Sequence, residues 1–294
     1  MKHRNLQGII PYLISPIKSE SGKVDKVVLD KLVKDLISKG VHGLSPLGST
    51  GEVHYLSWEQ KIDIVKTVIE STNGIVPVVP GVAANTAKDA IDQINFFEGL
   101  GVEGVVLILD TYFPLSKLDV INFFKKVANS VSCPIVLYNN PRFSGIDLTP
   151  DIVVELSTIP NIKYFKDATG NTGRLLSVIN KSEIKIFSAS AHIPLHVMEM
   201  GGVGWMAGPA CVFPEESVYL YNLISEQNWK SAYKLQRKLW RINEIFQKYN
   251  LAACIKTALK IQGYNVGDTI SPVTPLTSKE VKEIESVIKN ISNN

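Results

Sequence analysis

Short apolar runs alternate with longer amphipathic stretches through residues 8–208, and this alternation occurs eight times. The runs are rich in Val and Ile, as buried strands are, whereas the stretches between them repeat apolar residues every three or four positions, which is typical of helices. Strands that alternate with helices indicate a parallel sheet. The eight runs lie at residues 8–17, 43–48, 76–82, 104–110, 134–140, 162–168, 184–190 and 202–208.

Eight such strand–helix units predict an α/β fold, the (β/α)8 TIM barrel, with an open doubly wound sheet as the alternative. After Pro214 the apolar runs stop, and the remaining sequence predicts helices only. We therefore expect a barrel over residues 1–225 that carries the active site and a C-terminal helical domain over residues 226–294. Helix-terminal signals agree with this division into elements, because Ser57 precedes Gln60 in a capping-box spacing and Gly40 ends another amphipathic stretch.

Composition and charge narrow the classes of function. The 294 residues are 45% hydrophobic and carry 31 Lys and Arg against 28 Asp and Glu, and the basic residues are scattered, so a nucleic-acid partner is not expected. The sequence has no membrane-length apolar segment and no signal peptide, which favours a cytoplasmic protein without a membrane partner. The cysteines at positions 133, 211 and 254 lack metal-binding spacing and are read as small buried residues in a reducing compartment.

The active site of a TIM barrel lies at the C-terminal ends of the strands. Near the end of the sixth run stands Lys166, and period-two alternation places it on the same face as Tyr164 and opposite Lys163. If that face is the barrel interior, burial lowers the pKa of the lysine and leaves a neutral amine that can attack a ketone. The alternatives are a solvated lysine at the rim or a pair with Asp167.

The ends of two other apolar runs also contain candidate catalytic or binding residues. Tyr138 ends the fifth run, where its phenol can move protons beside an amine, although a packed core tyrosine is the commoner case. The second run ends in a segment from Gly48 to Glu52, in which glycines flank the hydroxyls of Ser49 and Thr50. Such a segment can bind a carboxylate through backbone N–H groups and hydroxyls, and it lacks the lysine of a nucleotide-binding loop.

Together, the GSTGE, YNNP and KDAT segments resemble the dihydrodipicolinate synthase and N-acetylneuraminate lyase family, in which similar motifs occur in this order. The resemblance spans residues 8–209, and the helical tail is similar to that family's C-terminal domain. It implies that Lys166 forms a Schiff base with pyruvate, that Tyr138 is the general acid and base, and that Ser49 and Thr50 bind the carboxylate and relay protons. No cofactor beyond this covalent lysine adduct is implied.

The resemblance extends to three more positions. Gly48 belongs to the carboxylate-binding segment, and Met206 matches the eighth-run segment whose backbone lines the pyruvate pocket. Tyr112, in the segment after the fourth run, matches a relay tyrosine that in the synthases reaches the active site of a neighbouring subunit. A homodimer or a homotetramer built as a dimer of dimers is therefore expected.

The chain also departs from the family's pattern. Typical synthases have an arginine five positions after the catalytic tyrosine, where this chain has Phe143, with Arg142 one position earlier. The sialic acid lyases have an acidic pair near the end of the seventh run, where this chain has the neutral segment 188–192. The residues around Val53, His54 and Thr111 do not match the lysine-inhibition site, so feedback by lysine is not expected.

These observations favour a Schiff-base lyase that acts on pyruvate or a related 2-oxo acid, similar to 4-hydroxy-tetrahydrodipicolinate synthase, with the aldehyde partner left open. An aldolase or dehydratase of 2-oxo-3-deoxy sugar acids is the alternative with the same chemistry. A non-catalytic sensor of small carboxylates is the alternative of another class. A metal-dependent aldolase is not expected, because His192 and His196, the one histidine pair at helical spacing, enclose Pro194.

Overall fold

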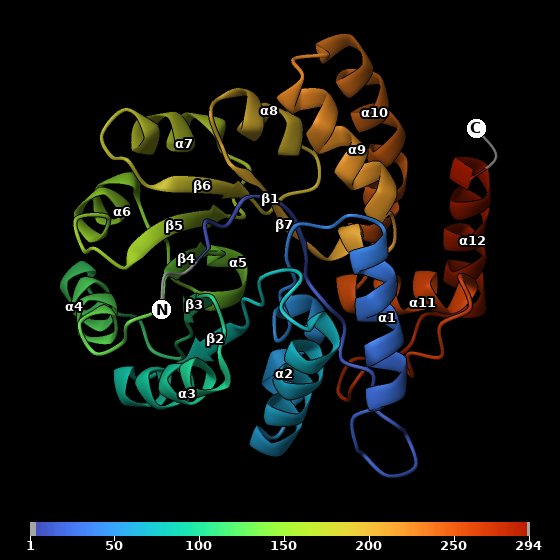
Figure 1. The fold of residues 1–294 in the computed structure, drawn as a ribbon, viewed down its shortest axis with the longest axis horizontal. Coiled ribbons are helices and arrows are strands. Elements are labelled where there is room, and N and C mark those ends of the chain that lie inside the picture. Colours follow the sequence, from blue (N-terminus) through green and yellow to red (C-terminus); the bar gives the residue numbers. More distant parts are fainter. Residues whose placement is uncertain (1–3, 293–294) are drawn as a thin grey trace.

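The computed structural model describes residues 4–292 and shows a parallel sheet that curls into a barrel, with helices around its outside (Figure 1). Within these residues the sheet has seven strands in the order β1-β7-β6-β5-β4-β3-β2. The strands are β1 (Gly8–Pro11), β2 (Gly81–Ala84), β3 (Val105–Leu109), β4 (Ile135–Asn139), β5 (Ile162–Asp167), β6 (Lys185–Ser188) and β7 (Gly204–Ala207). Apart from the second, every predicted run overlaps one of these strands; the third run, at residues 76–82, shares only residues 81 and 82 with β2.

The second predicted strand, at residues 43–48, is wrong as a regular strand. This segment makes isolated parallel bridges instead, one from Ser45 to Tyr12 after β1 and one from Leu44 to Val78 before β2. Prolines at positions 46, 77 and 80 explain the interruption, because proline has no N–H to donate to a ladder. The segment nevertheless joins the two edges of the sheet, so the predicted barrel is confirmed with seven strands and one bridging segment.

The helices outside the strands bring an amphipathic face to the sheet. Helix α2 begins after Ser57, whose hydroxyl accepts from the N–H of Gln60 while the Gln60 side chain accepts from the N–H of Ser57, as the spacing predicts. The helices of this part are α1 (Lys26–Ser38), α2 (Trp58–Thr72), α3 (Ala87–Leu100), α4 (Lys117–Ala128), α5 (Pro141–Ser144), α6 (Pro150–Leu156), α7 (Thr172–Ile179), α8 (Pro194–Glu199) and α9 (Pro214–Ser225), with short 3-10 turns η1 (Ser49–Gly51), η2 (Val53–Tyr55) and η3 (Gly208–Cys211).

The core has an inner and an outer part. The outer part lies between the strands and the helices and contains Phe165 from β5. The inner part fills the barrel, and it includes Tyr164 from the same strand together with Tyr138, Met206 and Tyr12. Successive residues of β5 therefore face opposite sides, and the predicted alternation is confirmed. The three cysteines are buried and unpaired.

Three further helices follow, α10 (Trp229–Phe246), α11 (Leu251–Ile261) and α12 (Ser278–Ser292). Helix α10 packs on α8 and α9, and α11 packs on the turns η1 and η3, which follow the bridging segment and β7. The helical region thus covers the C-terminal ends of the strands, where the site is expected. The domain boundary after residue 225 stays a prediction.

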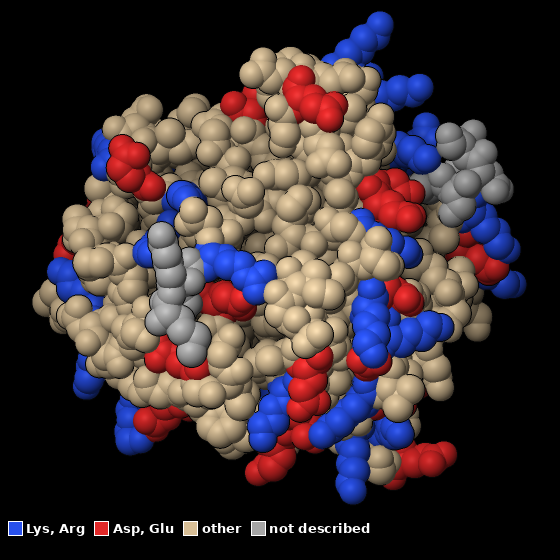
Figure 2. Space-filling model, in the orientation of Figure 1, with Lys and Arg blue, Asp and Glu red and all other residues tan. Residues whose placement is uncertain are grey.

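The distribution of charged side chains on the surface agrees with the near-equal numbers of basic and acidic residues. On the face seen in Figure 2, acidic and basic side chains are intermixed around the periphery, and the centre carries few charges. None of the helices in residues 4–292 is long and apolar enough to cross a membrane.

Candidate active site

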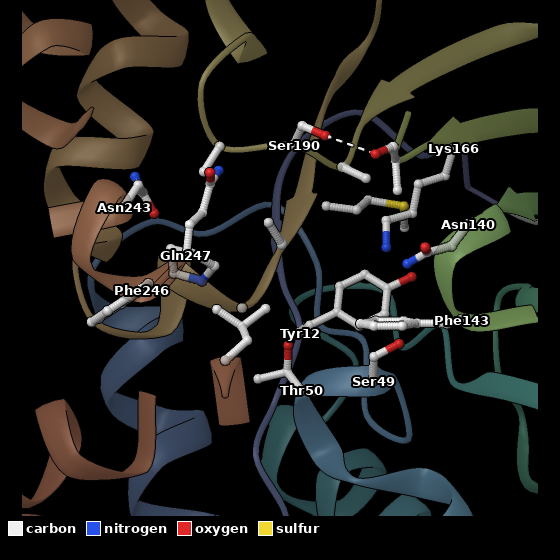
Figure 3. Close-up of a pocket in the computed structure, with 18 of the residues that line it drawn as sticks. Tyr12, Ser49, Thr50, Asn140, Phe143, Lys166, Ser190, Asn243, Phe246 and Gln247 are labelled. Atoms are coloured by element: carbon white, nitrogen blue, oxygen red, sulfur yellow. Dashed lines mark hydrogen bonds between the residues drawn. The ribbon is translucent and has the colours of Figure 1, made fainter. Parts of the chain in front are cut away.

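Lys166 lies inside the barrel, and its side chain is only 4% exposed. It stands on β5 next to Tyr138 on β4, with which it is in register. Its Nζ lies 3.7 Å from the centre of the Tyr138 ring and 3.9 Å from the centre of the Tyr12 ring. Figure 3 shows Lys166 and Tyr12 in the same cavity. The lysine is therefore enclosed by aromatic surface, and the alternative of a solvated rim lysine is wrong.

The amine of Lys166 has no carboxylate partner within the described part of the chain. Asp167, next in sequence, points the other way and accepts hydrogen bonds from Asn139 Nδ2 at 2.8 Å and from Thr169 Oγ1 at 2.5 Å. Burial, with no carboxylate to oppose it, holds the pKa of Lys166 well below its usual value. The amine is thereby shifted toward its neutral, nucleophilic form.

Tyr138 is buried beside this amine, and its hydroxyl accepts a hydrogen bond from Asn140 Nδ2 at 2.9 Å. Because Asn140 supplies a donor, the phenolic proton remains free to be given to another group. Burial raises the pKa of Tyr138, and hydrogen bonds from Asn140 and Ser49 oppose that rise. The phenol is thus a proton donor at neutral pH that lies next to an amine whose pKa is lowered by burial.

The GSTGE segment reaches the same cavity from the bridging segment. Ser49 and Thr50 form the turn η1, and Thr50 is buried in the cavity wall. Gly48 is required for a steric reason, because a Cβ atom there would lie 1.9 Å from Cδ1 of Tyr12. Ser49, Thr50 and the inward-facing Met206 line the cavity of Lys166, whereas Gly48 lines the adjoining one.

The cavity above Lys166 has a volume of about 230 Å³. Its deep end is built from strand ends of the barrel, and its outer end from α5, the segment after β6, and helix α10 (Figure 3). Lys166 and Arg142 are the only charged side chains that line it within residues 4–292. The lining residues are Tyr12, Ser49, Thr50, Tyr138, Asn140, Arg142, Phe143, Lys166, Ala168, Ala189, Ser190, Ala191, Met206, Ala207, Gly208, Pro209, Asn243, Phe246, Gln247 and Leu251.

Sequence reasoning missed two parts of this site. Tyr12 directly follows β1, and that position at a strand end is a signal from which it could have been found. Asn243, Phe246 and Gln247 belong to the last turn of α10 and the residue after it, far along the chain from any barrel strand. No motif marks them, because their place depends on how the C-terminal helices pack.

Tyr112 does not lie in the cavity of its own chain. It follows β3 and is 92% exposed, with its ring against Phe113 at a centroid distance of 5.1 Å. Within one chain, therefore, Lys166, Tyr138, Ser49, Thr50 and Met206 come together, and Tyr112 stays apart. Its predicted role depends on a second subunit.

Phe143 and Arg142 lie on the short helix α5 at the mouth of the cavity. Both side chains are exposed, and both border the cavity. Arg142 therefore reaches the mouth, although it stands one position before the place of the arginine of typical synthases. A positive charge is available there without being fixed by a partner within the described residues.

Behind the strand ends, a polar network holds β4 and β5 together. Asn139 donates to Asp167 and to Asp147, and its oxygen accepts from the N–H of Leu148 at 2.8 Å. Arg174 holds both carboxylate oxygens of Asp147 at 2.7 Å. These bonds fix the strand ends on which Tyr138 and Lys166 stand.

A second cavity of about 390 Å³ adjoins the first, and Tyr12, Ser49 and Tyr138 line both. It is also lined by Val53 and by His54, whose Nε2 lies 2.8 Å from an Asp110 carboxylate oxygen. The absence of lysine feedback, expected from this region's sequence, stays a prediction.

The histidine pair does not form a metal site. Helix α8 begins at Pro194, so His192 precedes it and lies against Trp240, whereas His196 lies near Glu199. Within residues 4–292, no group of three or more His, Cys, Asp or Glu side chains is placed to hold a metal ion.

The family model that matches this chain, two relatives in sequence and a solved structure all belong to the same family. The model of the dihydrodipicolinate synthetase family matches residues 5–291. A 4-hydroxy-tetrahydrodipicolinate synthase of Methanosphaerula palustris is 31% identical over 96% of this chain and 98% of its own, and one from Halalkalibacterium halodurans is 29% identical over 97% of both chains. Among solved structures, the E. coli K12 protein YagE, of the dihydrodipicolinic acid synthase family and in complex with pyruvate, has a TM-score of 0.92 and 27% identity over 97% of this chain and 98% of its own.

Proposed function

The chain belongs to the dihydrodipicolinate synthetase family of pyruvate-utilising Schiff-base lyases, and from this premise we propose that Lys166 is the Schiff-base residue and that the enamine formed on it adds to an aldehyde. The observation that carries the proposal is the buried amine of Lys166, which has no ion-pair partner among residues 4–292 and lies 3.7 Å from the Tyr138 ring centre. A neutral amine is the form that attacks a ketone.

Each cavity residue then has its own role in the reaction. The Lys166 amine adds to the ketone carbon of pyruvate, and Tyr138 gives a proton to the resulting hydroxyl, which leaves as water. Loss of a methyl proton forms an enamine, which attacks the aldehyde carbon while the aldehyde oxygen takes up a proton. Hydrolysis of the new imine releases a 4-hydroxy-2-oxo acid and restores the amine. Ser49 and Thr50 would hold the carboxylate, and Met206 lines the same cavity.

Trapping with borohydride tests this proposal. Incubation of the protein with pyruvate and borohydride is expected to add the mass of a reduced pyruvate adduct to the wild type and nothing to Lys166→Ala. Lys163→Ala is a matched control, because Lys163 lies on the same strand but is exposed on the opposite face. An adduct that survives Lys166→Ala, or none on the wild type, would refute the proposed mechanism.

The aldehyde partner decides between two activities. The names of the relatives favour 4-hydroxy-tetrahydrodipicolinate synthase activity, for which the family resemblance implies aspartate semialdehyde as the partner. Phe143 at the cavity mouth favours the second candidate, an aldolase or dehydratase of 2-oxo-3-deoxy sugar acids, because no arginine at position 143 is present to hold the semialdehyde's carboxylate. A carboxylate sensor has less support, since the cavity contains the amine and phenol that catalysis needs and binding does not.

We further propose that the chain assembles as a homodimer or homotetramer. Tyr112, Phe113 and Leu115 are exposed side by side after β3, and exposed apolar segments of this kind mark interaction surfaces. If Tyr112 reaches a neighbouring site, Tyr112→Phe should lower kcat about tenfold or more without changing the oligomer. Enzyme assays and sedimentation measure the two effects separately, and a monomer with full activity would exclude the assembly as a requirement.

A further inference from the structure

The ring of Tyr12 lies almost as close to the Lys166 amine as the ring of Tyr138 does. The amine nitrogen, Nζ, is 3.9 Å from the centre of the Tyr12 ring and 3.7 Å from the centre of the Tyr138 ring. At these distances the nitrogen lies over the faces of the rings, where a cation is attracted by the π-electrons. No other aromatic ring among residues 4–292 lies over this nitrogen.

Tyr12 is held in this position from several sides. Its N–H donates to the carbonyl oxygen of Ala207 at 3.2 Å, and its own carbonyl oxygen accepts from Sγ of Cys211 at 3.1 Å. Its ring fills the space beside Gly48, where a Cβ atom would lie 1.9 Å from Cδ1 of Tyr12. The side chain is 2% exposed. The contact between the ring and the amine is therefore fixed by the fold.

Imine formation places a positive charge on the Lys166 nitrogen. The amine first adds to the ketone carbon of pyruvate and gives a carbinolamine. The carbinolamine hydroxyl leaves as water with the proton that Tyr138 donates, while the lone pair of the nitrogen forms the C=N bond. The product is an iminium cation with one N–H. Because no carboxylate side chain among residues 4–292 lines the cavity, the two ring faces supply the protein's attraction for this charge.

The rings favour an iminium more than an ammonium. An ammonium has three N–H donors, and two ring faces replace water poorly for all three. The iminium has one N–H and spreads its charge over nitrogen and carbon, so it loses less when it leaves water. Ring faces bind such cations well, as aromatic cages do for methylated ammonium groups. The cavity is therefore suited to the covalent intermediate rather than to the protonated lysine.

We propose that Tyr12 is a further catalytic residue, whose ring face stabilises the iminium cation on Lys166. This rests on the proposed function, because the cation forms only if Lys166 reacts with a ketone. The role belongs to the ring of Tyr12, whereas in Tyr138 the hydroxyl also moves protons. The hydroxyl of Tyr12 has no hydrogen-bond partner of ordinary geometry within the described residues, so Tyr12→Phe leaves no group unpaired.

A fluorination series on the full-length enzyme tests this role. Tyr12→Phe is prepared with zero, one, two or three fluorines on the phenylalanine ring, which weaken the attraction of the ring face for a cation at nearly constant size. The quantity measured is the pyruvate concentration that gives half of the maximal rate of borohydride trapping, with borohydride low enough to maintain the imine equilibrium. Tyr12→Phe without fluorine should resemble the wild type, and this concentration should rise with each fluorine, by about 5- to 30-fold at three.

Phe187 provides the matched control. It lies on β6 in register with Lys166, and it belongs to the same buried inner core as Tyr12. Its ring does not lie over the Lys166 nitrogen, so the same fluorines at Phe187 should leave the pyruvate concentration unchanged. A flat series at Tyr12, or an equal rise at Phe187, would overturn the proposed role.

Tyr12→Leu gives a second test, because it removes the ring and keeps an apolar side chain. Thermal unfolding shows whether this variant folds, and the fluorinated variants decide the question if it does not. A folded Tyr12→Leu should need at least as much pyruvate as the trifluorinated variant. A folded Tyr12→Leu that traps pyruvate like the wild type, or a Tyr12→Phe as impaired as Tyr12→Leu, would contradict a role of the ring face.

The same trapping measurement separates the two levels of the proposal. An adduct on the wild type together with a graded effect at Tyr12 supports both. An adduct on the wild type without a graded effect removes only the inference about Tyr12. Absence of an adduct on the wild type overturns the proposed function itself.

Discussion

The ion pair between Glu52 and Lys256 joins the GSTGE segment to helix α11, and both side chains are 2% exposed. Lys256 Nζ lies 2.6 Å from Glu52 Oε2 and also donates to the carbonyl oxygen of Asp268 at 2.8 Å. The other oxygen of Glu52 accepts from the N–H of Ile270 at 2.7 Å. The C-terminal region thereby holds the residue that follows the Ser49–Gly51 turn, and with it the hydroxyl groups of the cavity.

Lys256→Met should destabilise the protein strongly, because it leaves the Glu52 carboxylate buried without its charge partner. Breaking a buried pair in this way costs about 3–5 kcal/mol. At about 2–4 °C per kcal/mol for a chain of this size class, the melting temperature should fall by roughly 6–20 °C. Thermal and urea unfolding, followed by circular dichroism, measure the loss.

Two further variants test whether the burial of the pair causes this loss. Glu52→Gln combined with Lys256→Met removes both charges and keeps an acceptor for the N–H of Ile270, so it should recover most of the loss. Lys260→Met is the matched control one turn along α11, because the Lys260 pair with Asp268 is exposed and should contribute at most about 1 kcal/mol. A Lys256→Met loss as small as that of Lys260→Met, or a double variant as unstable as the sum of the single ones, would refute the claim that the pair acts through burial.

Three more substitutions test the site. Lys166→Met should abolish adduct formation and stabilise the fold at neutral pH. Burial lowers the folded-state pKa of Lys166, so the free-energy cost of burying the amine grows as the pH falls below the usual lysine value. The free energy of unfolding, measured by urea titration at several pH values, should therefore depend less on pH in the variant. Gly48→Ala should lower both stability, by about 1–3 kcal/mol, and adduct yield, since its Cβ would meet the Tyr12 ring. Arg174→Leu should cost about 1–3 kcal/mol in urea unfolding, because Asp147 loses its bidentate partner.

Each of these has an outcome that contradicts it. A Lys166→Met protein that is less stable than the wild type at neutral pH would mean that the amine is not buried at a cost. Normal adduct yield in Gly48→Ala would show that Tyr12 moves without consequence for the site. An Arg174→Leu protein as stable as the wild type would mean that the network behind β4 and β5 does not hold the strand ends.

The barrel and the lysine inside it could be predicted because both depend on local patterns. Alternation within 162–168 places Lys166 and Tyr164 on one face, and the order of the three short motifs points to the family. The prediction of a strand at 43–48 was wrong for an equally local reason. The prolines nearby have no N–H to donate to a ladder, and the sequence shows them. Apolar content alone did not distinguish a strand from a bridging segment.

The part of the cavity wall that helix α10 forms could not be predicted, because its position depends on packing between distant parts of the chain. Asn243 follows the last strand by more than a helix and a turn, and nothing in its own helix differs from an ordinary amphipathic pattern. Tyr112 is the opposite case, because the motif marks it while one chain leaves it exposed. A residue's motif and its place in the structure are therefore independent kinds of evidence.

The adjacency of Lys166 and Asp167 shows how strand geometry determines the chemistry. Two neighbours of opposite charge would pair on a flexible segment, and the lysine would then stay protonated. On β5 they face opposite sides, so the carboxylate is satisfied by Asn139 and Thr169, while the amine enters the barrel without a counter-charge from any described residue. A shift of one residue in the register of β5 would exchange the two faces and place the carboxylate in the cavity. The reactivity of the amine thus follows from the register of one strand as much as from the identity of the residue.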